Sequence, residues 1–300
     1  MSARFTISRF MISRFLLLGL ISSLVITLGC APTSQDKTSL PLFVTGTDES
    51  KMVVTRSGAE ITLDRADLAF GPLVLCAGTT AGELCEVARL EWLDTVVVNT
   101  LDSTLQQAGE LSGVTGPVRS WMYDLGISSQ LTSQDPFVLG AARELGGYSL
   151  VIEGRALVDE IELPFSASIP VQQTDDTELG VPVVRKSLSD QFFRDVAIDE
   201  RGLTIRFDPA DWIRNLDLSS YVGRQSCTAD GPSIACDGTQ EYTCEDEMTT
   251  SQRDCADLNQ VCLPQQGCAD MLEITSESQQ YRALRNAILS GVRPSFTWRD

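Results

Sequence analysis

The sequence contains no histidine in 300 residues. This absence excludes a Ser-His-Asp triad, a Cys-His nucleophile pair, and zinc or copper sites that use imidazole. No two cysteines stand at a Cys-x-x-Cys spacing, so a zinc site made of thiolates also lacks its usual signature. Gly-x-Ser-x-Gly, phosphate-loop and dinucleotide-binding motifs are absent as well. The sequence therefore predicts a protein that is not an enzyme, with no catalytic residue.

Basic side chains are also scarce. Lysine and arginine together number 23, against 41 aspartates and glutamates, which gives a net charge of −18. A protein that binds nucleic acid needs a basic surface to displace counterions from phosphates, so we expect no nucleic-acid partner. An anionic membrane surface would repel such a chain too, and we interpret the charge as a solvated surface.

The longest apolar run is short. It spans 15–28, follows Arg4, Arg9 and Arg14, and no acidic residue occurs before Asp36. A helix that crosses a bilayer needs about 20 apolar residues. A basic start, a short apolar run and a small residue at its end are typical of a secretory signal peptide. We therefore expect residues 1–29 to be removed on export.

The segment that ends this run, Thr27-Leu28-Gly29-Cys30, resembles the lipobox of bacterial lipoproteins. The resemblance implies cleavage after Gly29 and a diacylglycerol with palmitate-type chains on Cys30. Thr27 and Leu28 depart from the usual order of Leu followed by a small residue, so the alternative is an ordinary signal peptide without lipid. Ala31, where an aspartate would retain enteric lipoproteins at the inner membrane, implies the outer membrane. Residues 30–41 would then be the lipidated cysteine and its tether, and the protein would belong to the cell envelope.

Eight further cysteines, an even number in an exported chain, indicate a disulfide framework. Cys76 and Cys85 flank a glycine-rich loop, and we predict that they pair, which would stabilise the fold by about 2–3 kcal/mol. The other six lie in a stretch whose one aromatic residue is Tyr242; they are Cys227, Cys236, Cys244, Cys255, Cys262 and Cys268. Six cysteines allow 15 connectivities, and the sequence does not select one.

The six-cysteine stretch has a recognisable pattern. Cys-Asp-Gly is followed after five residues by Cys244, and Asp-Cys-Ala and Val-Cys come later. This pattern is similar to the small Cys-rich modules of uncharacterised lipoproteins from delta-type proteobacteria. The resemblance covers 227–268 and implies no known activity.

Between the tether and this stretch the sequence predicts short strands. Runs of β-branched and apolar residues are separated by Gly, Pro and Asp, which favours a mainly β, antiparallel β-sandwich over 42–222. A hairpin turning at Ser57-Gly58 is the clearest local signal. The expected strands are Met52–Arg56, Glu60–Asp64, Asp67–Phe70, Pro72–Cys76, Thr95–Asn99 as a central strand, Val118–Ile127, Tyr148–Leu157, Glu160–Val171, Val181–Val184 and Leu203–Phe207.

Two helices are expected near the C-terminus. Asp208 would cap a short one that begins with Pro209. A longer helix over 276–289 would start with a capping box of Ser276 and Gln279 and end at Gly291. The aromatic strand 296–298 would return to the sandwich. The Cys-rich module 223–270 is then an insert, and 271–300 supplies the last helix and strand.

The stretch 121–126, together with a C-terminal helix before an aromatic strand, resembles exported β-sandwich proteins of the methanobactin-operon type. The resemblance implies a sandwich fold. It implies no copper chemistry here, because this chain has no histidine.

Three further patterns have some features of functional sites. Ser34-x-x-Lys37 has the spacing of a Ser-Lys nucleophile but lies in the tether, where chance explains it. Hard cations take oxygen ligands, so Ca²⁺ is an alternative to solvated loops for two acidic groups. These groups are Asp175, Asp176 and Glu178, and Asp208 with Asp211. Aromatic rings bind sugars and proteins, but we expect core packing for Trp121, Tyr123, Trp212 and Trp298.

These observations predict a membrane-anchored lipoprotein that acts as a binding or structural module. Its partner would be an envelope protein or a glycan, contacted through the Cys-rich insert or an edge of the sandwich. The alternative is an envelope hydrolase that uses two carboxylates or Ca²⁺.

Overall fold

The computed structural model describes residues 35–79, 85, 87–128, 137–138, 140–170, 184–187, 192–222, 225, 227, 233–245, 247–290 and 293–299. The predicted signal peptide and Cys30 lie outside this range. Within it, no helix is both long and apolar enough to cross a membrane.

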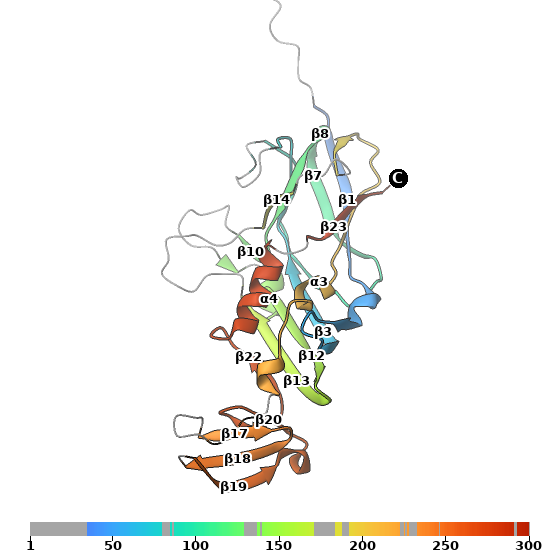
Figure 1. Cartoon of the computed structure of the whole chain (residues 1–300). Helices are drawn as coiled ribbons and strands as arrows, with labels where there is room; N and C mark the ends of the chain where they lie inside the picture. Colours follow the sequence, from blue (N-terminus) through green and yellow to red (C-terminus); the bar gives the residue numbers. More distant parts are fainter. Residues whose placement is uncertain are drawn as a thin grey trace, which may run out of the picture. The chain divides into compact units, whose positions relative to one another are not determined.

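Two sheets form the main body of residues 37–300 (Figure 1). In the described part of the chain one sheet has the strand order β14 (Val184–Ser187), β9 (Ser120–Tyr123), β4 (Leu73–Cys76), β5 (Ala88–Trp92), β7 (Gln106–Val114), β1 (Lys37–Thr45), β16 (Leu203–Arg206) and β23 (Ser295–Trp298). The other has the order β2 (Met52–Val54), β3 (Glu60–Phe70), β12 (Leu150–Val158), β13 (Ile161–Ile169) and β22 (Leu272–Ile274), with β6 (Val96–Asn99) also paired to β3. The predicted mainly β, antiparallel class is confirmed, although β1 pairs with β16, and β13 with β22, in parallel.

Smaller elements connect these strands. Two short pairs are β8 (Gly116–Val118) with β15 (Arg194–Val196), and β10 (Ile127–Ser128) with β11 (Phe137–Val138). The helical elements of this part are the short 3-10 helices η2 (Asp48–Lys51) and η3 (Ser219–Tyr221) and the α-helices α2 (Gly140–Glu144), α3 (Ala210–Ile213) and α4 (Gln279–Ser290).

Side-chain alternation builds the core between the sheets. In β1 the buried residues Leu40, Leu42 and Val44 alternate with residues on the other face, as expected for a strand with one face inside. In β3 the pairing with β12 skips Asp64, a β-bulge that shifts the inward positions by one. The strand can therefore continue to Phe70 with its apolar residues still facing inward, although the sequence predicts two strands here.

The predicted hairpin at Ser57-Gly58 is present, and β12 and β13 form a second hairpin. β2 pairs with β3 across the turn that contains Gly58, whose φ is +92°. β12 pairs with β13 along its whole length, and the two residues between them, Asp159 and Glu160, have φ of 48° and 66°. Positive φ at both central positions is the requirement of the tight hairpin turn that matches strand twist.

Two strand-level predictions are wrong. Among the described strands, β6 pairs with β3 alone, so it lies at an edge and is not a central strand. The tether is shorter than 30–41, because β1 already begins at Lys37 and pairs there with Val114 of β7. Lys37 therefore belongs to a sheet, and Ser34 of the Ser-x-x-Lys pattern lies outside the described residues.

The helix starts differ in detail from the prediction. Oδ1 of Asp208 accepts a hydrogen bond from the Ala210 amide at 3.0 Å, but the N-cap of α3 is Pro209, one residue later than predicted. For α4 the capping box of Ser276 and Gln279 is wrong. Ser278 is the residue whose Oγ accepts the Tyr281 amide, at 3.1 Å, and Gly291 lies outside the described residues.

The six-cysteine module has its own strands (Figure 1). They are β17 (Ile234–Asp237), β18 (Gln240–Glu245) and β19 (Met248–Asp254) in one sheet, and β20 (Val261–Leu263) with β21 (Gly267–Ala269) in another, with η4 (Cys255–Leu258) between them. After the module the chain forms β22, which pairs with β13, and later β23, which pairs with β16.

Disulfides hold the module together. The bonds join Cys227 to Cys244, Cys236 to Cys262 and Cys255 to Cys268, with Cα separations of 5.4, 5.8 and 5.2 Å. The loops they close interleave, and the buried cysteines contact one another in a cluster of their own. In the sandwich the structure joins Cys76 to Cys85, the pair that the sequence predicts, with a Cα separation of 5.5 Å.

A chain of aromatic contacts runs through the main core. Tyr123 lies 5.4 Å from Phe70 and 5.3 Å from Trp121, between ring centroids. Trp121 in turn stacks on Phe296 of β23 at 4.3 Å. β9 and β23 stand near opposite ends of the same sheet, so this stack shows that the sheet curls until its ends meet.

We expect Trp121→Ala to lower the free energy of unfolding by about 3–5 kcal/mol, because it empties a buried ring site and opens this closure. Urea unfolding under non-reducing conditions measures the change. Leu93→Ala, at a side chain that is 61% exposed, is the control and should change stability by less than about 0.5 kcal/mol. Equal effects of the two substitutions would contradict the closing role of Trp121.

Candidate binding site

A polar groove lies on the outer side of β13, β22 and the start of α4. In β13 the apolar side chains of Phe165 and Ala167 face the core, so Ser166 and Ser168 face outward. The parallel register places Ser166 beside Glu273 of β22, which is exposed. The sheet therefore presents hydroxyls and one carboxylate on the same face.

Two tyrosines complete the groove. Tyr148 follows the positive-φ pair Gly146-Gly147 and is 37% exposed. Tyr281, in the first turn of α4, is half-buried against the core. The groove encloses about 440 Å³, and its lining is Tyr148, Ser166, Ser168, Pro170, Glu273, Ile274, Thr275, Ser276 and Tyr281.

The surroundings of the Tyr281 phenol shift its pKa. Burial raises the pKa of Tyr281; Arg285 lowers it, and the neighbouring Tyr148 adds to the rise. Tyr281 is therefore neutral at physiological pH, and a neutral phenol both donates and accepts a hydrogen bond. The groove combines two aromatic rings, several hydroxyls and one carboxylate, which suits a ligand rich in hydroxyl groups.

The tryptophans and the tyrosine chosen from the sequence lie in the core, as expected. Trp121, Tyr123, Trp212 and Trp298 are 3%, 4%, 5% and 9% exposed. The indole of Trp298 donates to the Phe192 carbonyl at 2.8 Å, which satisfies its polar atom inside the protein.

The sequence did not single out Tyr148 and Tyr281 as site residues. Tyr281 lies on the apolar face of the last helix with Leu284 and Ile288, which are buried. Its ring is only half-buried, and this exposure depends on the packing of α4 beside β13. No local sequence pattern carries that information.

The acidic groups proposed for Ca²⁺ fall in two places. Asp175, Asp176 and Glu178 lie outside the described residues. Asp208 and Asp211 line a second pocket together with Arg206 and Arg293. Two guanidinium groups around the same space oppose a divalent cation, so the described geometry does not favour Ca²⁺ there.

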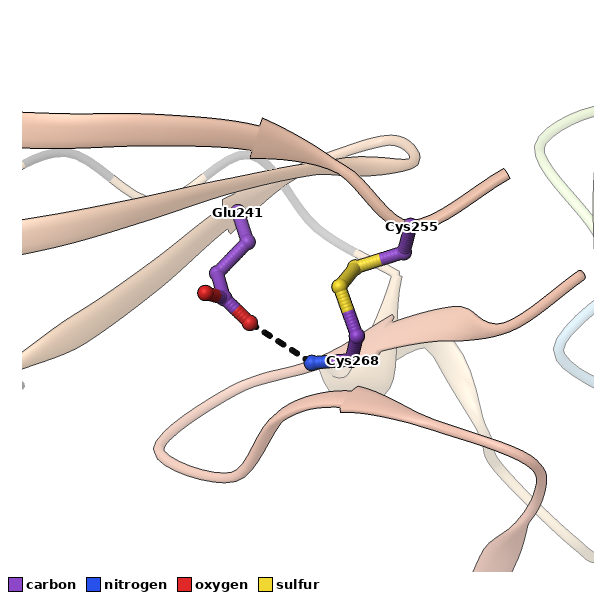
Figure 2. A group of neighbouring side chains, drawn as sticks. All are labelled: Glu241, Cys255 and Cys268. Carbon is purple, nitrogen blue, oxygen red and sulfur yellow. Dashed lines mark hydrogen bonds between the residues drawn. A yellow bond between two sulfur atoms is a disulfide. The ribbon is translucent and has the colours of Figure 1, made fainter. Parts of the chain in front are cut away.

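Glu241, Cys255 and Cys268 bring a carboxylate and two sulfur atoms together (Figure 2). Protein sulfur binds metal ions as thiolate, but Cys255 and Cys268 are joined in a disulfide. Figure 2 shows the carboxylate accepting a hydrogen bond from the Cys268 amide, at 2.7 Å. The cluster as it stands is therefore a structural contact.

Glu241 ties β18 to two neighbouring segments. Besides the Cys268 amide it accepts two hydrogen bonds from Arg253 of β19, at 2.8 and 3.0 Å. Gly267 must be glycine here, because its φ is +83° and a Cβ would collide with the Glu241 carboxylate. Burial raises the pKa of Glu241, but the bonds from Arg253 and the Cys268 amide together outweigh burial and hold it below its ordinary value of 4.5.

No family model matches the chain, and no curated protein matches it. Among solved structures, MbnP from Methylosinus trichosporium is similar with a TM-score of 0.35 and 9% sequence identity, over 62% of this chain and 80% of that one. This similarity assigns neither a family nor a function.

We expect Glu241→Gln to destabilise the protein by about 1–3 kcal/mol at neutral pH, because it weakens charge-assisted hydrogen bonds to Arg253 and Cys268. Because the pKa of Glu241 is lower in the folded state, this stability is fully present above pH 4.5. It is lost as the pH falls through the pKa that Glu241 has in the folded protein. The wild type should therefore lose stability on acidification below 4.5 more steeply than the variant.

Urea titrations at several pH values, without reductant, measure both effects. The exposed Glu247→Gln is the matched control and should follow the wild-type profile. We call the hydrogen bonds of Glu241 to Arg253 and to the Cys268 amide the Glu241 clamp. Parallel pH profiles of the unfolding free energy for the wild type and Glu241→Gln would contradict its stabilising role.

Proposed function

We propose that this protein is an exported envelope lipoprotein, anchored by lipid on Cys30, that binds a glycan in the groove between Tyr148 and Tyr281. The observation that carries the proposal is the composition of this groove. It places two tyrosine rings beside four hydroxyl side chains and a single carboxylate. The binding role requires no catalytic residue.

A sugar ring offers two kinds of surface to such a groove. Its C–H faces are apolar enough to lie against an aromatic ring, and Tyr148 presents a partly exposed ring for this contact. Its hydroxyls exchange hydrogen bonds with serine and threonine hydroxyls, and they donate to a carboxylate such as Glu273. Since Glu273 and the acidic chain repel anions, a neutral glycan is favoured over a phosphorylated or uronic one.

The groove supports binding better than hydrolysis. Glycoside hydrolysis typically uses two carboxyl groups that flank the scissile bond. Among the described residues that line the groove, Glu273 is the one carboxylate. We therefore propose that the groove binds a glycan without hydrolysing it.

The anchor is supported by the N-terminal sequence alone. The basic start, the apolar run and Gly29-Cys30 favour export followed by lipidation. The lipid would attach the protein to a membrane that its acidic chain would otherwise not approach. Two or three acyl chains on Cys30 would hold the protein stably, whereas one chain holds only marginally. With Ala31 next, we place the protein at the outer membrane.

Titration calorimetry with neutral oligosaccharides, namely cellohexaose and the hexamer of N-acetylglucosamine, tests the glycan site. We expect at least one to bind, and Tyr148→Ala to weaken that binding at least about tenfold through loss of the ring contact. Tyr148→Phe keeps the ring and should retain most of the affinity. Tyr242→Ala in the Cys-rich module is the matched control.

Two results would contradict this proposal. One is the absence of heat with both neutral sugars. The other is hydrolysis of a sugar that Glu273→Gln abolishes, which would favour the hydrolase alternative.

The intact mass of the N-terminal peptide from membrane fractions tests the anchor. We expect a peptide that begins at Cys30 and carries a diacylglycerol, with or without an N-acyl chain. Cys30→Ser should release the protein from the membrane pellet, because no thiol is left to take the lipid. An unmodified N-terminus in the wild type would show that the protein is not lipid-anchored.

A further inference from the structure

A second pocket, separate from the tyrosine groove, opens beside α3 and the start of β23. It encloses about 400 Å³, within the range of small-molecule sites. Its floor is apolar and belongs to the core: Tyr123, Phe207 and Trp212 are 4%, 2% and 5% exposed. The floor is therefore held rigidly by the same packing that holds the fold.

Four charged side chains stand around this floor. Arg206 ends β16, Asp208 and Asp211 belong to the turn and helix that follow, and Arg293 precedes β23. Arg206 donates to Oγ1 of Thr47 at 2.8 Å, which fixes its direction. The Asp211 carboxylate and the Arg293 guanidinium form no ion pair or hydrogen bond within the described part of the chain.

Charges of both signs line the pocket. Burial raises the pKa of Asp211, the charge of Asp208 adds to the rise, and Arg214 opposes both. A ligand cation beside Asp211 would act in the same direction as Arg214. Burial also raises the pKa of Tyr123, while Arg293 opposes the rise, which places the positive charge of Arg293 near the Tyr123 hydroxyl. Asp211 and Arg293 thus line one pocket, and neither side chain has an ion pair or hydrogen bond among the described residues.

We propose that this pocket binds a small zwitterion with an apolar side chain, an amino acid or a dipeptide. The ligand ammonium lies against Asp211, its carboxylate against Arg293, and its side chain on Phe207 and Trp212. A charged hydrogen bond at each end fixes the orientation, and burial of the side chain supplies apolar contact.

Other ligand classes fit the pocket less well. A divalent cation would meet Arg206 and Arg293, and a phosphate would meet Asp208 and Asp211. A purely apolar molecule would cover the floor but would leave the charges around it desolvated and unpaired. A zwitterion meets each sign of charge with its opposite.

Titration calorimetry on the full chain with its disulfides intact tests the inference. L-phenylalanine is the zwitterionic probe. Phenethylamine lacks the carboxylate and 3-phenylpropionate lacks the ammonium, while all three keep the same ring. We expect L-phenylalanine to bind at least about tenfold more tightly than either analogue, because only it satisfies both charges. L-phenylalanyl-L-leucine distinguishes a peptide from a free amino acid: tighter binding than L-phenylalanine assigns a dipeptide site, and weaker binding a free amino acid.

Two variants test the two ends separately. Asp211→Asn should bring the affinity for L-phenylalanine down to that for 3-phenylpropionate, and Arg293→Gln should bring it down to that for phenethylamine. The exposed Asp257→Asn and Arg56→Gln are matched controls and should leave the affinity unchanged. Urea unfolding of each variant checks that the fold persists.

The inference is overturned if the three aromatic probes bind equally, since the pocket would then recognise the ring alone. It is overturned as well if none of the probes binds, or if both pocket variants bind L-phenylalanine as the wild type does. The tyrosine groove is tested with neutral sugars, so failure of one site is distinguishable from failure of the other.

Discussion

The pairing of β23 with β16 is the constraint on which the rest of the structure depends. It places Phe296 on Trp121 and so joins the two ends of the curled sheet. It also positions Arg293 and Ser295, because Arg293 lies just before β23 and Ser295 is its first residue. The groove takes one wall from the start of α4, and the charged pocket takes one from the segment after it. The charged pocket therefore depends directly on the return of the last strand to the sheet.

The two parts of the chain reach stability by different means. The sandwich buries leucine, isoleucine, valine and aromatic side chains between sheets, and each contributes through area removed from water. The module has few such residues, and its buried centre is made of cysteines. Its three bonds close short loops, each worth about 3 kcal/mol in the unfolded-state model. Glu241 adds a polar clamp where apolar contacts are lacking.

Local sequence signals predicted much of the fold because the physics behind them is local. The Ser57-Gly58 turn and the short Cys76–Cys85 loop depend on neighbouring residues, and the structure has both. The edge position of β6 and the pairing of the six other cysteines depend on distant segments, which local patterns do not encode. The same holds for both sites. Asp208 and Asp211 were visible as an acidic pair, but Arg293 reaches them only through the return of β23.

The module also bears on the groove, although it lines neither candidate site. Val261, Leu263 and Ala269 of the module pack against the main core cluster, so its second sheet is attached to the sandwich by apolar contact. β22 begins soon after β21 and pairs in parallel with β13, which sets Glu273 beside Ser166. A strand of three residues gains few hydrogen bonds of its own. Its register is better defined when the segment before it is held by the Cys255–Cys268 bond and the Glu241 clamp. The disulfides thus act on the groove by fixing where β22 starts.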